Sequence, residues 1–262
     1  MASNREVYDG IEFEKWAFHE GLESTERHLI EQYLDKDRTT LEAGTGGGRI
    51  VRALRELGFT SLAGFDYVPR LIEQAKQNDA SSQIRFDVQD AVDLDYEDAS
   101  FDQVVYLQQV LCFMETEAER RTAVREAYRI LSVGGVALFS FLWFEDRQRS
   151  PVIRFFSRYL GILRMLRRST RRLQSQPWLR HGNRPNVGSL MDRGPYVYWY
   201  RAAEAEQQLR QAGFEIHAIG STSDAERGRL VASSAHLDPN STGTGLYVVV
   251  KKPRLGGAAS AY

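Results

Sequence analysis

Residues 39–50 decide the fold, and they read Thr-Thr-Leu-Glu-Ala-Gly-Thr-Gly-Gly-Gly-Arg-Ile. The first five form a β-rich run that predicts a strand over Thr39–Ala43. From Ile50 onward, apolar residues recur at helical spacing until Gly58. The glycines between strand and helix allow a tight turn that presents amide groups to a ligand at the positive end of the helix. The stretch therefore predicts a ligand-binding strand-to-helix turn.

Outward from this turn, β-rich runs alternate with helical periodicity, which is typical of a parallel sheet covered by helices on both faces. Helices are predicted at 69–78, at 117–131 and around 205–212, and Gly134-Gly135 is predicted to form a turn before the fifth strand. The further strands are predicted at 62–66, 84–88, 102–107, 136–142, 214–219 and 246–251. We therefore expect an α/β fold with a doubly wound, mostly parallel seven-stranded sheet.

Two segments, 1–38 and 143–201, stand outside this alternation, and both are candidates to cover a site. The predicted organisation has four parts: an N-terminal helical cap segment at 1–38, an α/β core at 39–142 and 202–252, a cap or lid insert at 143–201, and a flexible tail at 253–262.

Composition excludes several classes of protein. The chain has 262 residues, a net charge of -1 and 42% hydrophobic residues, which argues against disorder and against a nucleic-acid-coating protein. Its single cysteine, Cys112, excludes a disulfide scaffold and a cysteine-cluster metal site, and no metal site is predicted. We find no signal peptide pattern and no apolar run long enough to span a bilayer. The expected location is the cytoplasm.

The insert is strongly basic, with 13 Arg, no Lys and only three acidic residues between Glu145 and Arg201. Within it, Val152–Leu173 has the pattern of a basic amphipathic helix, with apolar residues on one face and arginines on the other. Three functional interpretations stay open: a lid whose apolar face lines an acceptor pocket, a surface for acidic substrates, or a peripheral attachment to anionic lipid. The simpler alternative is a helix packed on the domain with its Arg face in solvent.

Carboxylates follow two of the predicted strands. Asp66 ends the second strand, 20 residues after Gly46, and Asp90 follows the third. Either one alone is more often a loop or cap residue. Because open parallel sheets bind ligands along the carboxyl edge of their strands, the series indicates an adenosine site, with Asp66 on the ribose hydroxyls and Asp90 on the adenine amino group.

At these residues the chain resembles the class I S-adenosylmethionine-dependent methyltransferases, from about Thr39 to Ile219 and again at the last strand. The family's first motif, an acid followed by Gly-x-Gly-x-Gly, matches Glu42, Gly44, Gly46 and Gly48. Later motifs match Asp66, Asp90-Ala91, Phe101-Asp102-Gln103-Val104, Arg129, Leu131, Gly134-Gly135 and Ala212-Gly213-Phe214. The chain departs from the family at Ser132-Val133 and at Cys112-Phe113, and the second departure leaves the substrate class open.

The resemblance implies a Rossmann-like methyltransferase fold, with S-adenosylmethionine as cofactor and S-adenosylhomocysteine as product. Glu42 would orient the glycine-rich loop or meet the cofactor's ammonium group through water. Arg49 would pair with the methionine carboxylate or remain a solvated helix residue. The implied cofactor-binding residues are Glu42, Gly44, Thr45, Gly46, Arg49, Asp66, Tyr67, Asp90, Ala91 and Gln108. The candidate substrate-binding residues are Trp16, His19, Phe113, Tyr198 and Tyr200.

The expected reaction is methyl transfer to an N or O atom of a small, partly hydrophobic metabolite. No catalytic base is assigned among His19, His181, His236, Tyr198 and Tyr200. A nucleic-acid acceptor is disfavoured because no recognition module is visible, and the oligomeric state stays open. Two alternatives remain: a non-catalytic cofactor-binding accessory or regulatory subunit, and a nicotinamide-dependent oxidoreductase. The second is disfavoured because Arg49 occupies the last glycine position of a Gly-x-Gly-x-x-Gly fingerprint.

Overall fold

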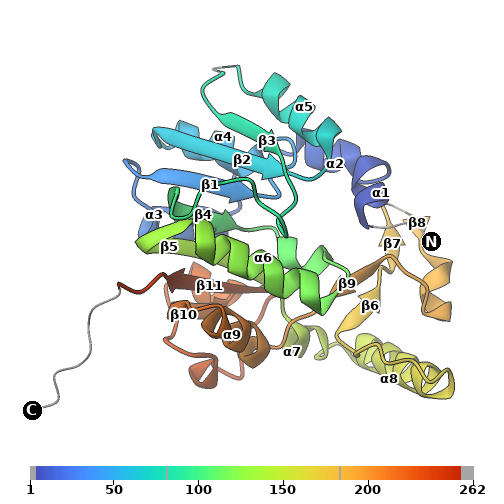
Figure 1. Ribbon diagram of the computed structural model, residues 1–262. Helices are drawn as coiled ribbons and strands as arrows, with labels where there is room; N and C mark the ends of the chain where they lie inside the picture. The colour runs from blue at the N-terminus through green and yellow to red at the C-terminus, as the bar shows by residue number, and fades with distance from the viewer. Residues whose placement is uncertain (1–3, 81, 183, 255–262) are drawn as a thin grey trace, which may run out of the picture.

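The computed structural model describes residues 4–80, 82–182 and 184–254, and it is built around a seven-stranded sheet (Figure 1). The strand order is β10-β11-β5-β4-β1-β2-β3. Strand β11 is antiparallel to β10 and to β5, and the remaining pairs are parallel. The bounds are β1 Thr39–Ala43, β2 Ser61–Asp66, β3 Arg85–Val88, β4 Phe101–Tyr106, β5 Leu131–Leu142, β10 Glu215–Ser221 and β11 Gly245–Lys251. The prediction of a doubly wound, mostly parallel seven-stranded sheet is confirmed.

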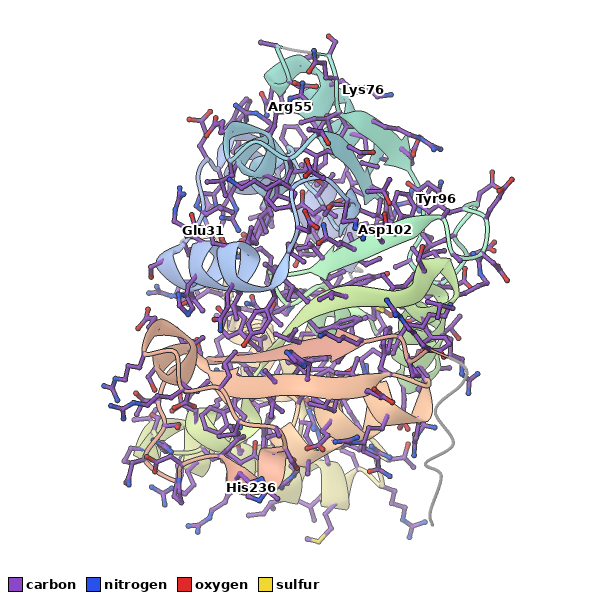
Figure 2. All side chains as sticks on the ribbon, turned by 90° about the vertical axis from the view of Figure 1, so that its left-hand side faces the viewer. Glu31, Arg55, Lys76, Tyr96, Asp102 and His236 are labelled. Atoms are coloured by element: carbon purple, nitrogen blue, oxygen red, sulfur yellow. The ribbon has the colours of Figure 1, made fainter. Side chains whose placement is uncertain are left out.

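Helices cover both faces of the sheet. One hydrophobic cluster packs α6 (Glu117–Ile130) and α9 (Ala202–Gln211) on one face. On the other face, a second cluster packs α3 (Ser24–Tyr33), α4 (Arg49–Glu56), α5 (Pro69–Asn78) and α10 (Thr222–Glu226). In Figure 2, Glu31 on α3 and Arg55 on α4 lie on one side of the strands, and Tyr96 lies on the other. Neighbouring strand residues such as Val104 and Val105 divide between the two clusters, because successive side chains of a strand point to opposite faces.

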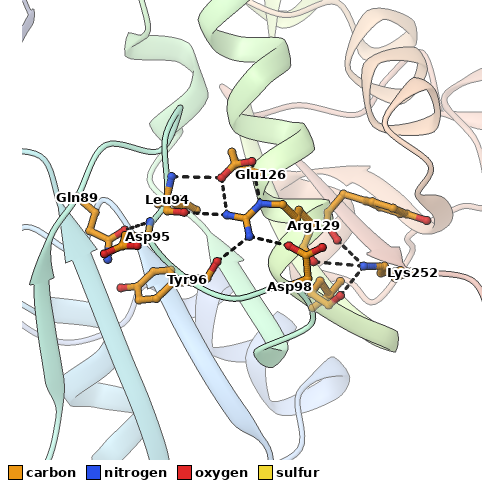
Figure 3. Close-up of polar contacts among 10 residues, drawn as sticks. Gln89, Leu94, Asp95, Tyr96, Asp98, Glu126, Arg129 and Lys252 are labelled. Atoms are coloured by element: carbon orange, nitrogen blue, oxygen red, sulfur yellow. Dashed lines mark hydrogen bonds and ion pairs between the residues drawn. The ribbon is translucent and has the colours of Figure 1, made fainter.

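The turn predicted at Gly134-Gly135 is wrong, because β5 already begins at Leu131. The pairing with β4 shifts register between the Phe101–Leu131 and Gln103–Val136 pairs, so this segment is an irregular extension of the strand. Gly134 takes a φ of +81° and donates its N–H to the carbonyl of Lys252. The Lys252 ammonium in turn donates to the carbonyls of Tyr128 and Leu131, where it satisfies acceptors at the end of α6 (Figure 3).

From Asn4 onward, the described residues before β1 form α1 (Asn4–Asp9), α2 (Phe13–Phe18) and α3. The insert after β5 contains α7 Phe144–Arg147, α8 Pro151–Leu166, β6 Ser175–Pro177, β7 Arg180–His181, β8 Arg184–Pro185, η2 Val187–Met191 and β9 Tyr196–Tyr198. Two further short turns are η1 Val110–Phe113 and η3 Ser234–His236. Most of the predicted tail, 255–262, lies outside the described residues.

The prediction for the amphipathic helix is wrong in its length and in its division into one apolar face and one arginine face. Helix α8 ends at Leu166, short of Leu173, and Arg168 follows with a φ of +52°. The side chains of Phe155 and Leu166 are 75% and 73% exposed, whereas Arg164 is buried. Apolar residues therefore lie on both sides of α8. Leu160 and the half-buried Ile153 and Phe156 pack against the domain together with Arg164, whereas Phe155 and Leu166 face outward.

Arg164 explains this orientation. Its guanidinium forms two hydrogen bonds with the buried Asp192 carboxylate, at 2.7 and 2.6 Å, and donates to the carbonyls of Arg172 and Ser175. Such a two-point pair is the strongest kind of side-chain hydrogen bonding to a carboxylate. It fixes which side of α8 faces the protein.

Candidate functional site

A cavity of about 270 Å³ lies at the carboxyl ends of β1 to β4, where open α/β sheets place their ligands. Its walls bring together residues from the strand ends, from η1 and from the N-terminal helices. The lining residues are Asn4, Arg5, Tyr8, Trp16, Gly44, Gly46, Phe65, Asp66, Tyr67, Leu71, Gln89, Asp90, Ala91, Val92, Gln108, Val110, Phe113, Met114, Glu115 and Glu119.

The glycine-rich turn forms one wall of the cavity. Gly44 and Gly46 take positive φ angles of +63° and +54°, a conformation that favours glycine, and both residues line the cavity. Thr45 lies between them but is buried, and its hydroxyl donates to Glu42 at 2.6 Å. Thr45 therefore shapes the turn from behind the wall.

Glu42 lies behind the cavity wall, among the buried residues. Its carboxylate accepts hydrogen bonds from the Thr45 hydroxyl and, at 2.9 Å, from the N–H of Val51 in the first turn of α4. Of the two roles expected for Glu42, these contacts support orientation of the loop. Burial raises the pKa of Glu42 to about 7, against the lowering effect of these hydrogen bonds.

Replacing Glu42 with Gln should change how stability depends on pH. Burial raises the folded-state pKa from 4.5 to about 7, so the native protein loses stability as pH rises through this interval, by about 3 kcal/mol in total. Glutamine does not titrate. We therefore expect the melting temperature of Glu42→Gln, relative to the parent, to increase between pH 5 and pH 8. Thermal unfolding across this range measures it.

The matched control is Glu56→Gln, at the exposed end of α4. Its melting temperature should follow that of the parent protein at every pH. A pH-independent difference for Glu42→Gln would contradict a raised pKa at this carboxyl group.

Asp66 is held at the cavity wall by the backbone. One carboxylate oxygen accepts the N–H of Gly46 and the other accepts the N–H of Val68, both at 3.0 Å. Burial raises the pKa of Asp66 to about 6, against the lowering effect of these two amides. The neighbouring Tyr67 also lines the cavity, and burial raises the pKa of its phenol. Asp66 thus presents a positioned carboxylate to the cavity at neutral pH.

Asp90 and Ala91 line the cavity beyond β3, and Val92 donates its N–H to Asp90 at 3.2 Å. The connection that follows, residues 93–100, is cross-linked to α6 through Arg129 (Figure 3). The Arg129 guanidinium donates to the carbonyls of Leu94 and Tyr96 and pairs with Glu126 and Asp98. Gln89, itself a lining residue, accepts the N–H of Asp95 at 2.7 Å. The cavity edge at Asp90 is therefore supported by α6.

The expected contact of Arg49 with the cofactor is not supported, and the solvated alternative is wrong. Arg49 is 5% exposed and forms two hydrogen bonds of 2.7 Å with the Glu26 carboxylate. It also donates to the carbonyl of Gly21 at 2.6 Å. Arg49 therefore fastens α4 to the segment around α3, and it is not among the residues that line the cavity. Gln108 does line the cavity, and its amide contacts the same Glu26 carboxylate.

The structure brings two of the five candidate substrate residues, Trp16 and Phe113, to the cavity. His19 lies at the end of α2, outside the lining residues. Tyr198 and Tyr200 are buried in the core, where their hydroxyls donate to Glu204 and Gln208. Burial raises the pKa of both tyrosines. Aromatic packing therefore explains the tyrosine pair, and the substrate role expected for it is not supported.

Sequence reasoning missed Asn4, Arg5 and Tyr8, which α1 contributes to the cavity. Arg5 is the one cation among the described residues that line it. The ring of Tyr8 packs edge-on against Phe113, at 5.6 Å between ring centres, and against Trp178, at 6.0 Å. Nothing in the sequence pattern predicts that α1 lies at this edge of the sheet, because tertiary packing alone brings it there.

Gly47 holds the N-terminal helices against the glycine-rich turn. Its N–H donates to the carbonyl of Trp16 at 2.9 Å. A Cβ atom at position 47 would lie 2.1 Å from the carbonyl oxygen of Ala17, so only glycine allows this approach. Asn4 adds a second attachment, because its amide donates to the carbonyl of Tyr196 at 3.0 Å and to that of Phe113.

Comparison with known proteins shows which domain the core of the chain resembles. Residues 41–139, which contain the glycine-rich turn, Asp66, Asp90 and Gln108, match the family model described as "Methyltransferase domain". Over these residues the chain is similar to a methyltransferase domain. The cofactor of this family is S-adenosylmethionine.

Relatives of the methyltransferase domain include a demethylmenaquinone methyltransferase of Deinococcus radiodurans, which is 34% identical over 101 residues. That match spans 37% of this chain and only 40% of the relative's length. A SAM-dependent methyltransferase structure from Methanosarcina mazei has a TM-score of 0.62 at 20% identity, over 86% of this chain and 97% of that one. The cyclase SpnF has a TM-score of 0.59 at 18% identity, over 96% and 97% of the two chains. Both structures share the fold.

The residues that line the cavity fit a polar cofactor such as S-adenosylmethionine. The indole N–H of Trp16 and the side-chain oxygen of Asn4 are buried and have no hydrogen-bond partner among the described residues. Buried polar groups are normally paired, so these two atoms fit a ligand that supplies the missing partners. Asp66 and Asp90 add the acceptors that an adenosine moiety needs.

Within the described residues, we find no group of three or more His, Cys, Asp or Glu side chains arranged to hold a metal ion. In the same part of the chain, no helix combines the length and the apolar character needed to cross a membrane.

Proposed function

We propose that this protein transfers the methyl group of S-adenosylmethionine to an N or O atom of a small, partly hydrophobic metabolite. The observation that carries the proposal is the convergence of the glycine-rich turn, Asp66 and Asp90 on one cavity. In it, Asp66 accepts the ribose hydroxyls and Asp90 accepts the adenine amino group, with Ala91 beside it. Gly44 and Gly46 allow close approach of the cofactor to the backbone.

The acceptor would lie between aromatic walls formed by Tyr8, Trp16 and Phe113, near the carboxylates of Glu115 and Glu119. The cofactor, when bound, supplies a methyl group that is already activated for transfer, so the protein contributes mainly positioning and exclusion of water. Burial raises the pKa of Tyr8 well above its ordinary value, so its phenol stays protonated and is able to donate a hydrogen bond to the acceptor. An amine that binds in its neutral form needs no further base.

We also propose that the segments 1–38 and 143–201 together cover this site. Tyr8 of α1 packs against Trp178 of the insert. In addition, the N–H of Gly182, in the turn after β7, donates to the Glu12 carboxylate at 3.0 Å. These contacts support a cap that spans the mouth of the cavity and shields the reacting atoms from water. A chain with one cysteine suits a reducing compartment, and we propose the cytoplasm as its location.

Arg5 replaces Arg49 as the proposed partner of the cofactor's carboxylate, because it is the cation that lines the cavity. Its guanidinium lies 5.6 Å from the centre of the Tyr67 ring. We expect Arg5→Gln to weaken S-adenosylhomocysteine binding about tenfold, the effect of losing one charge-assisted hydrogen bond. Calorimetry measures it, with Arg27→Gln on α3 as control. Equal affinities of the parent protein and Arg5→Gln would show that a group other than Arg5 binds the cofactor's carboxylate.

The proposal is tested by calorimetric titration of the purified protein with S-adenosylhomocysteine, and with NADH for comparison. Saturable binding of S-adenosylhomocysteine alone is expected. Transfer of a labelled methyl group to a panel of amines, phenols and carboxylates then tests turnover. Binding without any turnover would favour the non-catalytic alternative. The cyclase SpnF has the same fold with a different activity, so the fold alone does not establish methyl transfer. Binding of NADH alone would overturn the proposal.

A further inference from the structure

Helix α8 presents an apolar stripe to solvent. We define the stripe as Val152, Phe155, Tyr159, Ile162 and Leu166, which recur every three or four residues and therefore share one side of the helix. The exposed fractions run from 37% for Tyr159 to 75% for Val152 and Phe155. Soluble monomers rarely expose a continuous apolar surface of this kind unless it binds something.

The stripe continues onto the neighbouring turn η2. The Tyr159 hydroxyl donates to the carbonyl of Leu190 at 2.6 Å, which holds the two elements together. On η2 the side chains of Val187, Leu190 and Met191 are also exposed. The contact joins the exposed apolar side chains of α8 to those of η2. In Figure 1, α8 lies at the lower right edge, apart from the seven-stranded sheet.

Exposed arginines border the stripe. We define this arginine border as Arg154, Arg158, Arg167, Arg168 and Arg171. No acidic residue occurs between positions 147 and 191 of the sequence, so nothing on α8 itself neutralises these charges. The acid that follows, Asp192, is already paired with the buried Arg164.

The distribution of charge around the stripe indicates which partner it binds. A second copy of this chain packed stripe to stripe would bring two arginine borders together without acids on either helix, and like charges repel. An anionic lipid surface complements both features, because the apolar side chains enter the acyl boundary while the arginines meet the headgroups. We propose that the apolar stripe and the arginine border dock this protein on anionic membranes, with α8 lying in the plane of the interface.

The rest of the insert suits this role. The Arg164–Asp192 pair and the buried Leu160 hold the opposite side of α8 against the protein, so the stripe faces outward. The same insert supplies Trp178 beside Tyr8 at the cavity. Docking through α8 therefore brings the covering segment of the cavity towards the lipid.

The test is co-sedimentation of the full chain with phosphatidylcholine vesicles, prepared with and without phosphatidylglycerol. The parent protein should bind only the vesicles that contain phosphatidylglycerol, and salt should weaken the binding. Phe155→Ser/Ile162→Ser and Arg154→Gln/Arg158→Gln should each reduce binding more than about tenfold. The matched controls are Val133→Ser on β5 and Arg125→Gln on α6, both exposed sites outside the insert. Neither control substitution should change binding to the vesicles.

Three results would overturn the proposal: no binding of the parent protein to anionic vesicles, binding that both double variants retain, or a dimer in light scattering that Phe155→Ser/Ile162→Ser dissociates. The dimer would assign the stripe to a second copy. Circular dichroism and S-adenosylhomocysteine titration of the same samples check that the variants fold. Since vesicle binding needs no cofactor, its failure is distinguishable from a failure of the proposed methyl transfer.

Discussion

Replacing Asp66 with alanine is expected to weaken S-adenosylhomocysteine binding by more than about 100-fold, because a carboxylate that accepts two ribose hydroxyls contributes two charge-assisted hydrogen bonds. The variant also releases the N–H groups of Gly46 and Val68, which both donate to Asp66 in the structure. The glycine-rich turn then loses part of its support. Isothermal titration calorimetry measures the affinity, and thermal unfolding reports whether the fold survives.

Two further variants separate the causes. Asp66→Asn keeps an oxygen that accepts one of these N–H groups, so its affinity should lie between those of the parent and Asp66→Ala. Asp93→Ala, at an exposed position of the connection that follows Asp90, should bind like the parent protein. An affinity of Asp66→Ala within about twofold of the parent, in a folded sample, would remove the ribose role from this carboxylate.

Replacing Arg164 with alanine is expected to destabilise the insert by about 3–5 kcal/mol, the usual cost of leaving a buried charge without its partner. Asp192 would keep its burial but lose both hydrogen bonds from the guanidinium. Two carbonyl groups, of Arg172 and Ser175, would also lose their donor. Hydrogen exchange should show the loss first in α8 and in residues 167–193, with the seven-stranded sheet less affected.

The control for this prediction is Arg158→Ala, an exposed arginine of the same helix, which should cost less than about 0.5 kcal/mol. A double variant, Arg164→Met/Asp192→Leu, removes both charges and should recover much of the lost stability. Equal losses for Arg164→Ala and Arg158→Ala would show that the pair does not hold the insert in place.

The sequence was informative where chain order alone determines position. Parallel strands end at one edge of the sheet, so the residues after β1 to β4 had to meet there, and Asp66, Asp90 and Gln108 do. Arg49 shows the limit of this reasoning. Its partner Glu26 comes from a helix outside the alternating pattern, and the local sequence contains no sign of that pairing.

The same limit applies to α1 and α8. Helical periodicity predicted a helix at α8, but the side of it that packs inward depends on Asp192, 28 residues from Arg164. The N-terminal helices reach the cavity because Gly47 has no side chain to meet Ala17 of α2 and because Asn4 of α1 donates two hydrogen bonds. Contacts between distant segments of this kind have no periodicity, so the pattern of the sequence does not reveal them.

Docking of the N-terminal helices through Gly47 makes cavity assembly part of ligand recognition. Because α1 supplies Asn4, Arg5 and Tyr8, the binding-competent population is the population in which this segment is in place. The apparent dissociation constant of any ligand equals its intrinsic value divided by that population. By the same thermodynamic linkage, a bound ligand stabilises the docked state of α1 and α2 and protects them from proteolysis. The rate of cleavage in these helices therefore reports how much of the site is occupied.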